Sequence, residues 1–107
     1  MQEISASAAA ELLQDNPDTT VLLDVREPAE LETAAVSSAV HIPMGDIPTR
    51  LEELDRGKTI VCMCHLGGRS AQVAAYLESQ GFPEVINMAG GIEAWAATVD
   101  SGVGKAD

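Results

Sequence analysis

Two short runs of apolar residues constrain the fold of this chain more than any other feature. The first is "TTVLLDV", residues 19–25, and the second is "KTIVCM", residues 58–63. Both runs are continuous and rich in β-branched residues, which is typical of strands with both faces buried. Shorter runs, "AVHIP" at 39–43 and "EVINM" at 84–88, predict two more strands. Such strands usually belong to a parallel sheet with helices on its faces.

The segments between these runs carry helix signals. Ser5 or Ser7 can cap a first helix, and Pro28 can begin a short helix that runs to Thr33. Gly81 can close a helix over 70–80 in the left-handed conformation. Two more helices are expected, one beginning near Pro48 and one over residues 90–99. The alternation predicts an α/β protein with three layers, in which helices flank both faces of a central, mostly parallel sheet.

Length and charge limit the classes of function. The chain has 107 residues, enough for one domain, and no apolar run approaches the roughly 18 residues of a membrane span. With 17 acidic and six basic residues, its net charge of −11 would repel a nucleic acid backbone. The acidic N-terminus lacks the features of an export signal, so we expect the protein in the reducing cytoplasm. We also expect a monomer. Residues 100–107 are expected to form a flexible tail.

Both cysteines lie in the stretch "VCMCHLGGRS", residues 61–70. Cys64 is expected at the carboxyl end of a central strand, which is where ligand sites of such sheets lie. Cys62 lies inside the strand and is interpreted as a small buried hydrophobic residue. Within these residues, Cys64 is therefore the candidate nucleophile.

The turn after Cys64 has the composition of an anion cradle. Gly67 and Gly68 allow backbone conformations in which successive N–H groups point into one concavity, and the following helix adds the positive end of its dipole. Such surroundings lower the pKa of a thiol. The planar guanidinium of Arg69 is suited to bind an oxyanion.

These motifs resemble those of the rhodanese family of sulfurtransferases. "CHLGGRS" is similar to the family's active-site loop, and "LLDVREPAEL" to its buried strand, Asp-x-Arg pair and short acidic helix. "VHIPMGDIPTRLEEL" and "VINMAGGIEAW" resemble its middle and C-terminal segments. The resemblance implies a rhodanese-like α/β/α fold, with a rhodanese domain at residues 1–99 followed by the tail at 100–107.

The resemblance also implies a ping-pong reaction. A Cys64 thiolate would take the outer sulfur of thiosulfate or a persulfide, hold it as a persulfide, and pass it to cyanide or a thiol. No metal and no organic cofactor are required. The implied partners are small sulfur-containing anions or persulfides and thiol or cyanide acceptors, and a protein donor or acceptor stays open.

The resemblance assigns roles to nine residues. Cys64 would be the catalytic nucleophile, and Asp24 and Arg26 would support the site as a structural ion pair. The role of His65 stays open, because an exposed loop histidine can also have no function. The substrate-binding residues would be His65, Leu66, Gly67, Gly68, Arg69 and Ser70.

One departure and three alternatives accompany this interpretation. Residues 34–38 lack the Gly-His-Ile-x-Gly-Ala pattern common in the family, which affects a local turn more than the chemistry.

A phosphatase or arsenate reductase on the same fold would have five residues between Cys and Arg, whereas four separate Cys64 from Arg69. A non-catalytic binding module usually lacks the cysteine. A metal site is disfavoured, because Cys62, Cys64 and His65 lie too close in sequence to surround one ion.

Overall fold

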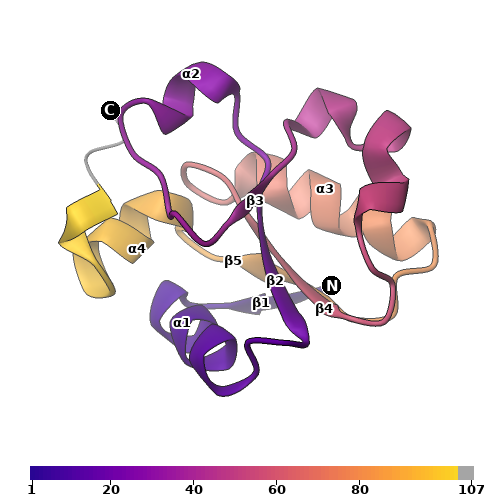
Figure 1. Cartoon of the computed structure of the whole chain (residues 1–107), viewed down its shortest axis with the longest axis horizontal. Helices are drawn as coiled ribbons and strands as arrows, with labels where there is room; N and C mark the ends of the chain where they lie inside the picture. The colour runs from indigo at the N-terminus through magenta and orange to yellow at the C-terminus, as the bar shows by residue number, and fades with distance from the viewer. Residues whose placement is uncertain (104–107) are drawn as a thin grey trace.

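A five-stranded parallel sheet runs through the middle of the structure, a computed structural model that describes residues 1–103 (Figure 1). Its strand order is β1-β5-β4-β2-β3, and every strand pair is parallel. The strands are β1 (Gln2–Ile4), β2 (Thr20–Asp24), β3 (Val40–His41), β4 (Thr59–Met63) and β5 (Val85–Met88). The four predicted strands are all present, and the predicted parallel arrangement is confirmed.

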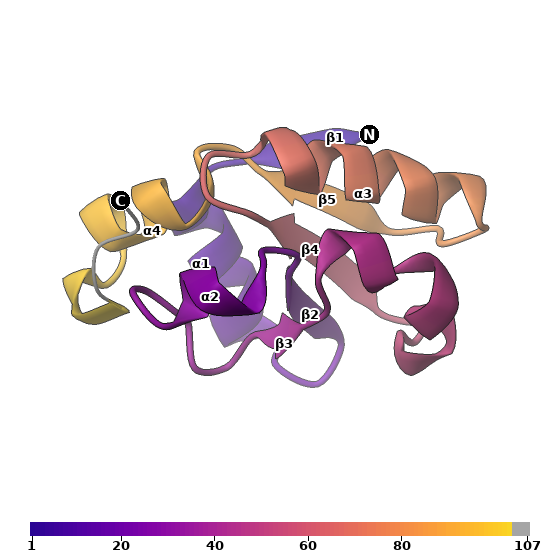
Figure 2. The ribbon, with the colours of Figure 1, turned by 90° about the horizontal axis from the view of Figure 1, so that it is seen from above.

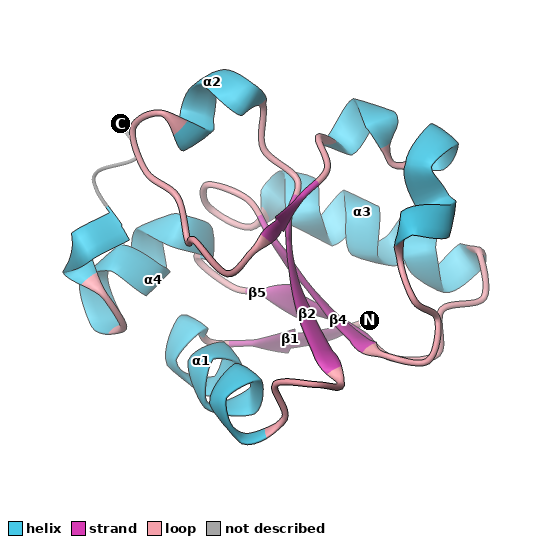
Figure 3. Ribbon diagram, in the orientation of Figure 1, coloured by secondary structure: helices cyan, strands magenta, loops and turns pink. Residues whose placement is uncertain are grey.

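Helices cover both faces of this sheet. The α-helices are α1 (Ala6–Asp15), α2 (Pro28–Leu31), α3 (Gly68–Ser79) and α4 (Gly91–Thr98), and the 3-10 helices are η1 (Met44–Asp46), η2 (Pro48–Glu53) and η3 (Ser101–Val103). In Figures 1 and 2, α3 with η1 and η2 lies to the right of the sheet, and α1 and α4 lie to the left. Figure 3 shows the same layers by secondary structure. The predicted three-layer α/β/α fold is confirmed. Within residues 1–103, no helix is both long enough and apolar enough to span a bilayer.

Side chains of the central strands alternate between two cores. On the α3 face, Leu23 of β2 and Cys62 of β4 pack in one buried cluster with Leu77 of α3. On the other face, Val61 of β4 packs in a second cluster with Trp95 of α4. Because successive strand residues point to opposite faces, Cys62 and Cys64 both point toward α3.

Three elements differ from the sequence prediction. Strand β1 was not predicted, because three residues are too few to show a period, and it forms by pairing with β5. Helix α3 begins at Gly68 instead of Ser70, since Gly67 takes a positive φ of 114° and serves as its N-cap. The segment beginning at Pro48 is a 3-10 helix interrupted at Arg50 (φ −115°, ψ 19°).

The C-terminal segment begins with ordered contacts. The Ala35 N–H donates to the Val103 carbonyl at 3.1 Å. The last four residues of the predicted flexible tail, 104–107, lie outside the described residues.

The predicted ion pair between Asp24 and Arg26 is confirmed at the end of β2. The Arg26 side chain is 0% exposed and donates from Nη2 to Asp24 Oδ2 at 2.8 Å and from Nε to Asp24 Oδ1 at 3.0 Å. The same side chain also donates to the carbonyls of Glu30 (3.3 Å) and Ala34 (2.8 Å). The buried pair therefore positions α2 and the turn after it, the region that departs from the family pattern.

Asp24→Asn should lower the free energy of unfolding by roughly 3 kcal/mol, because it leaves the buried Arg26 guanidinium without a counter-charge. Urea denaturation followed by circular dichroism measures this loss. Arg50→Gln is a matched control, since Arg50 and Glu53 form an exposed ion pair and its loss should matter much less. Equal losses in the two variants would contradict the structural role given to Asp24.

Candidate active site

Cys64 lies directly after β4, at the carboxyl edge of the sheet. From β2 the chain continues outward to β3, and from the adjacent β4 it continues in the opposite direction to β5. In open α/β sheets, ligands bind where the strand order reverses in this way. The Cys64 loop, residues 64–67, passes between α2 and α4 in Figure 1. Position alone therefore favours this loop as the site.

The thiol of Cys64 points into the turn that begins α3. The Gly67 N–H donates to Cys64 Sγ at 3.0 Å, and Ser70 Oγ lies 3.3 Å from the same sulfur. The φ of 114° at Gly67 is what turns these donors back toward the thiol, and only glycine adopts it readily. Cys64 is 1% exposed, so the residues of the turn cover its sulfur almost completely.

The two cysteines differ sharply in acidity. Burial raises the pKa of the Cys64 thiol, but hydrogen bonds from the Ser70 hydroxyl and from the backbone N–H groups of Ser70, Gly67 and Leu66 lower it by more. The net result is a pKa below the usual 9.0. Burial, with a smaller contribution from the charge of Cys64, raises the pKa of Cys62 to about 12. Because the thiolate is the reactive form, these surroundings favour Cys64 over Cys62 as the nucleophile.

A polar network behind Ser70 was not predicted from the sequence. Asn87 of β5 is completely buried, and its Oδ1 accepts from Ser70 Oγ at 2.6 Å, in competition with the Cys64 sulfur for the single proton of that hydroxyl. Asn87 Nδ2 donates to Glu3 Oε2 at 2.9 Å and to the Gly67 carbonyl at 3.1 Å. Asn87 thus fixes both the hydroxyl beside the thiol and the backbone at the loop's last residue. The sequence signal for this network was a single asparagine, Asn87, among the apolar residues of its strand.

The N-terminus of α4 holds the other end of the loop. The Ile92 N–H donates to the Cys64 carbonyl at 2.9 Å, and the Glu93 N–H donates to the His65 carbonyl at 3.2 Å. Gly91 lies so close that a Cβ there would collide with both carbonyls, and its φ of 56° also favours glycine. The sequence signal was the pair Gly90–Gly91, whose contact with the Cys64 loop could not be predicted.

Arg69 lies in the first turn of α3, where its guanidinium faces a carboxylate. Its Nη1 and Nη2 donate to Glu30 Oε1 (2.6 Å) and Oε2 (2.9 Å) of α2. The hydrogen bond from Arg69 is the main reason that the pKa of Glu30 falls from 4.5 to about 2. Glu30 is therefore ionised at any pH near neutrality, and this pair persists. The oxyanion-binding role predicted for Arg69 stays a prediction, since the fork is engaged by Glu30.

The remaining predicted site residues lie at different distances from the thiol. His65 Nε2 is 3.0 Å from Glu93 Oε2, and the Leu66 side chain is 64% exposed at the loop's surface. The Asp24–Arg26 pair contacts the backbone of residues 30–34 and so supports the loop only through α2. Within residues 1–103, no three His, Cys, Asp or Glu side chains gather closely enough to hold a metal ion.

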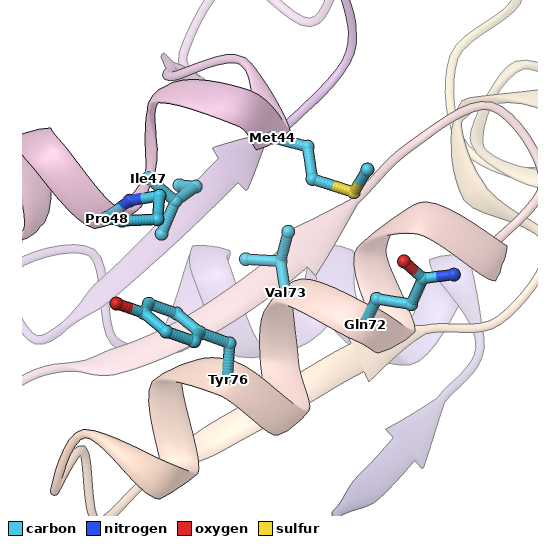
Figure 4. Close-up of a pocket in the computed structure, with 6 residues that line it drawn as sticks. All are labelled: Met44, Ile47, Pro48, Gln72, Val73 and Tyr76. Carbon is cyan, nitrogen blue, oxygen red and sulfur yellow. The ribbon is translucent and has the colours of Figure 1, made fainter.

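Two hollows lie away from the Cys64 loop. One, of about 200 Å³, lies between η1, η2 and α3 (Figure 4) and is lined by Met44, Ile47, Pro48, Gln72, Val73 and Tyr76. The other, of about 230 Å³, lies beside β2 and includes Leu13 and Val40. Residues 64–67 line neither of these two hollows.

Comparison with known proteins gives a consistent picture. Residues 5–98 match the family Rhodanese-like domain. The putative sulfurtransferase YtwF of Bacillus subtilis is 42% identical, over 89% of this chain and 90% of its own. The thiosulfate sulfurtransferase GlpE of Pseudomonas syringae is 38% identical, over 73% of this chain and 74% of its own. The crystal structure of SSP1007 from Staphylococcus saprophyticus superimposes with a TM-score of 0.81 at 31% identity, over 98% of this chain and all of its own.

Ser70→Ala should raise the pKa of the Cys64 thiol, because it removes a hydrogen bond that stabilises the thiolate. The rate of alkylation by iodoacetamide, followed by mass spectrometry across pH, should then reach its midpoint at a higher pH than in the unmodified protein. Ser79→Ala, at the far end of α3, is the control, since Ser79 Oγ donates to the Tyr76 carbonyl. If the pH midpoint of alkylation were the same in Ser70→Ala as in the unmodified protein, the hydroxyl would not stabilise the thiolate.

Proposed function

This chain belongs to the rhodanese-like domain family, and on that premise we propose that it transfers a sulfane sulfur through a persulfide on Cys64. The observation that carries the proposal is the thiol's environment: Gly67 N at 3.0 Å, the Ser70 hydroxyl at 3.3 Å, and a lowered pKa. The thiolate is the form that attacks sulfur, and a lowered thiol pKa increases its share at a given pH. The named sulfurtransferases among its relatives support the same class of reaction.

The first half-reaction loads sulfur onto the enzyme. The Cys64 thiolate attacks the outer sulfur of a donor, thiosulfate or a persulfide, and the donor's S–S bond breaks. Sulfite or a thiolate leaves with the electron pair of that bond. The turn's N–H groups, which surround the Cys64 sulfur, are placed to stabilise the negative charge of the new persulfide.

The second half-reaction returns the enzyme to its starting state. Cyanide, a small thiolate or a protein thiol attacks the outer sulfur of the persulfide, and the bond to Cys64 Sγ breaks. The acceptor leaves as thiocyanate or as a new persulfide, and the Cys64 thiolate is regenerated. No proton donor beyond the turn is needed, because the leaving thiolate is the form that the turn already stabilises. The two-step scheme predicts ping-pong kinetics.

The other functional classes have less support. A binding module without catalysis would not need a thiol with a lowered pKa among three N–H donors. A phosphatase on this fold would have five residues between Cys and Arg, whereas four separate Cys64 from Arg69. Both cysteines are free, which fits a reducing compartment such as the cytoplasm.

Cys64→Ser should abolish sulfur transfer, because a serine hydroxyl in the same place is a poor nucleophile without a base. Cys62→Ser should retain most activity and lose about 1–3 kcal/mol of stability from a buried hydroxyl. Intact mass after incubation with thiosulfate, and separately with glutathione persulfide, measures the gain of one sulfur atom.

Removal of that sulfur by cyanide distinguishes a persulfide from an oxidised thiol. The matched pair of cysteine variants separates the two candidate nucleophiles within the same strand and loop. The proposal would be refuted if the Cys64→Ser protein gained sulfur, or if the unmodified protein gained no sulfur from either donor.

A further inference from the structure

Both basic residues beside Cys64 are paired with carboxylates from other elements. Arg69 makes two hydrogen bonds to Glu30 of α2, at 2.6 and 2.9 Å. His65 Nε2 lies 3.0 Å from Glu93 Oε2 of α4. The Cys64 loop therefore has an acidic side chain on each flank, because it passes between these two helices (Figure 1).

The pairing changes what an approaching anion encounters. Glu30 accepts from one N–H of each terminal nitrogen of Arg69, so an anion must displace it to use the same pair of N–H groups. The Arg69 and Glu30 side chains are 35% and 30% exposed, so water only partly screens their interaction. The hydrogen bond to Glu30 raises the pKa of Arg69, and the charge of Glu27 makes a smaller contribution in the same direction. Burial lowers this pKa, but by less. Arg69 thus lies among carboxylates and is not a free cation.

We propose that Glu30 is a specificity-determining residue, which by holding Arg69 disfavours thiosulfate and favours organic persulfides as donors. The inference rests on the sulfurtransferase function proposed above. Thiosulfate carries two negative charges within a few bonds of the transferred sulfur, whereas the charges of a thiol-derived persulfide can lie far from it. The 64% exposed Leu66, beside Cys64, offers an apolar contact to the organic part of such a donor.

The favoured step is balanced in atoms and electrons. The Cys64 thiolate attacks the outer sulfur of R–S–S–H, and a new S–S bond forms at Cys64. The donor's S–S bond breaks, and R–S⁻ leaves with its electron pair. The outer sulfur keeps its proton or gives it to water, so neither an oxidant nor a reductant is consumed.

Glu30→Gln tests this role with little disturbance of the fold. Glu30 Oε1 also accepts from the Glu27 N–H at 3.0 Å, which closes the cap of α2, and a glutamine oxygen can keep that bond. The glutamine NH₂ group, however, replaces the acceptor that faces Arg69 Nη2. The substitution therefore removes the charge and the second hydrogen bond to Arg69 while leaving the helix cap in place.

The expected result is a change in donor preference. In Glu30→Gln, kcat/KM for thiosulfate should rise about tenfold relative to kcat/KM for glutathione persulfide, since a charge-assisted bond to a partly exposed arginine becomes available. Glu32→Gln is the matched control: it removes one charge from the same segment, and within residues 1–103 Glu32 makes no side-chain ion pair. An unchanged ratio in Glu30→Gln, or an equal rise in Glu32→Gln, would overturn the proposal.

A double variant tests whether Glu30 acts through Arg69. The gain in thiosulfate preference should disappear when Glu30→Gln is combined with Arg69→Ala, because no guanidinium is left to receive the donor. If the gain persists in the double variant, Glu30 acts as a repelling charge by itself, and the role assigned to its pairing with Arg69 is wrong.

Alkylation of Cys64 gives a readout that does not depend on sulfur transfer. Iodoacetate and iodoacetamide differ by one negative charge at nearly equal size, so the ratio of their rates reports how the site receives an anion. The ratio should rise several-fold in Glu30→Gln and stay near its original value in Glu32→Gln. If the ratio rises while no donor loads sulfur onto Cys64, the proposed function fails and the electrostatic role of Glu30 stands. An unchanged ratio refutes that role directly.

Discussion

Two backbone hydrogen bonds from α4 fix the position on which the whole site depends. The N–H groups of Ile92 and Glu93 bind the carbonyls of Cys64 and His65, so the loop cannot relax away from the sheet edge. The contact is possible only because Gly91 has no Cβ to strike those carbonyls. With this end of the loop held, the left-handed turn at Gly67 directs its N–H to the thiol at 3.0 Å. The reactivity of Cys64 is in this sense set by the backbone, with Ser70 as the main side-chain contribution.

Much of the fold was predictable because its signals are local. The apolar runs at 19–25 and 58–63 indicated central strands, and Gly81, with φ 90°, ends the third α-helix as its sequence suggested. The position of Cys64 followed from the end of its strand. The assignment of Cys62 to the core followed from its place inside the buried strand, and Cys62 is completely buried. Each of these features depends on neighbours within a few residues in the sequence.

The contacts that sequence reasoning missed join segments that are distant in the sequence. Strand β1 exists by pairing with β5, in which Gln2 lies opposite Ile86, more than 80 positions away in the sequence. Asn87 contacts the active turn through Ser70 and the Gly67 carbonyl, and it also binds Glu3 of β1. Glu30 reaches Arg69 across 39 residues, and nothing in the local sequence of either residue indicates the pairing. Because of that pairing, Arg69 is a cation already bound to the Glu30 carboxylate and not an open site for an oxyanion.

The central claim is that the turn after β4 holds a persulfide on Cys64 through its backbone N–H groups. A crystal structure of the protein treated with a sulfur donor, at a resolution that separates the two sulfur atoms, tests it most directly. The account predicts one additional sulfur bonded to Cys64 Sγ, within hydrogen-bonding distance of N–H groups among residues 66–70. An additional sulfur on Cys62, or a Cys64 persulfide whose outer sulfur points away from these N–H groups, would contradict it.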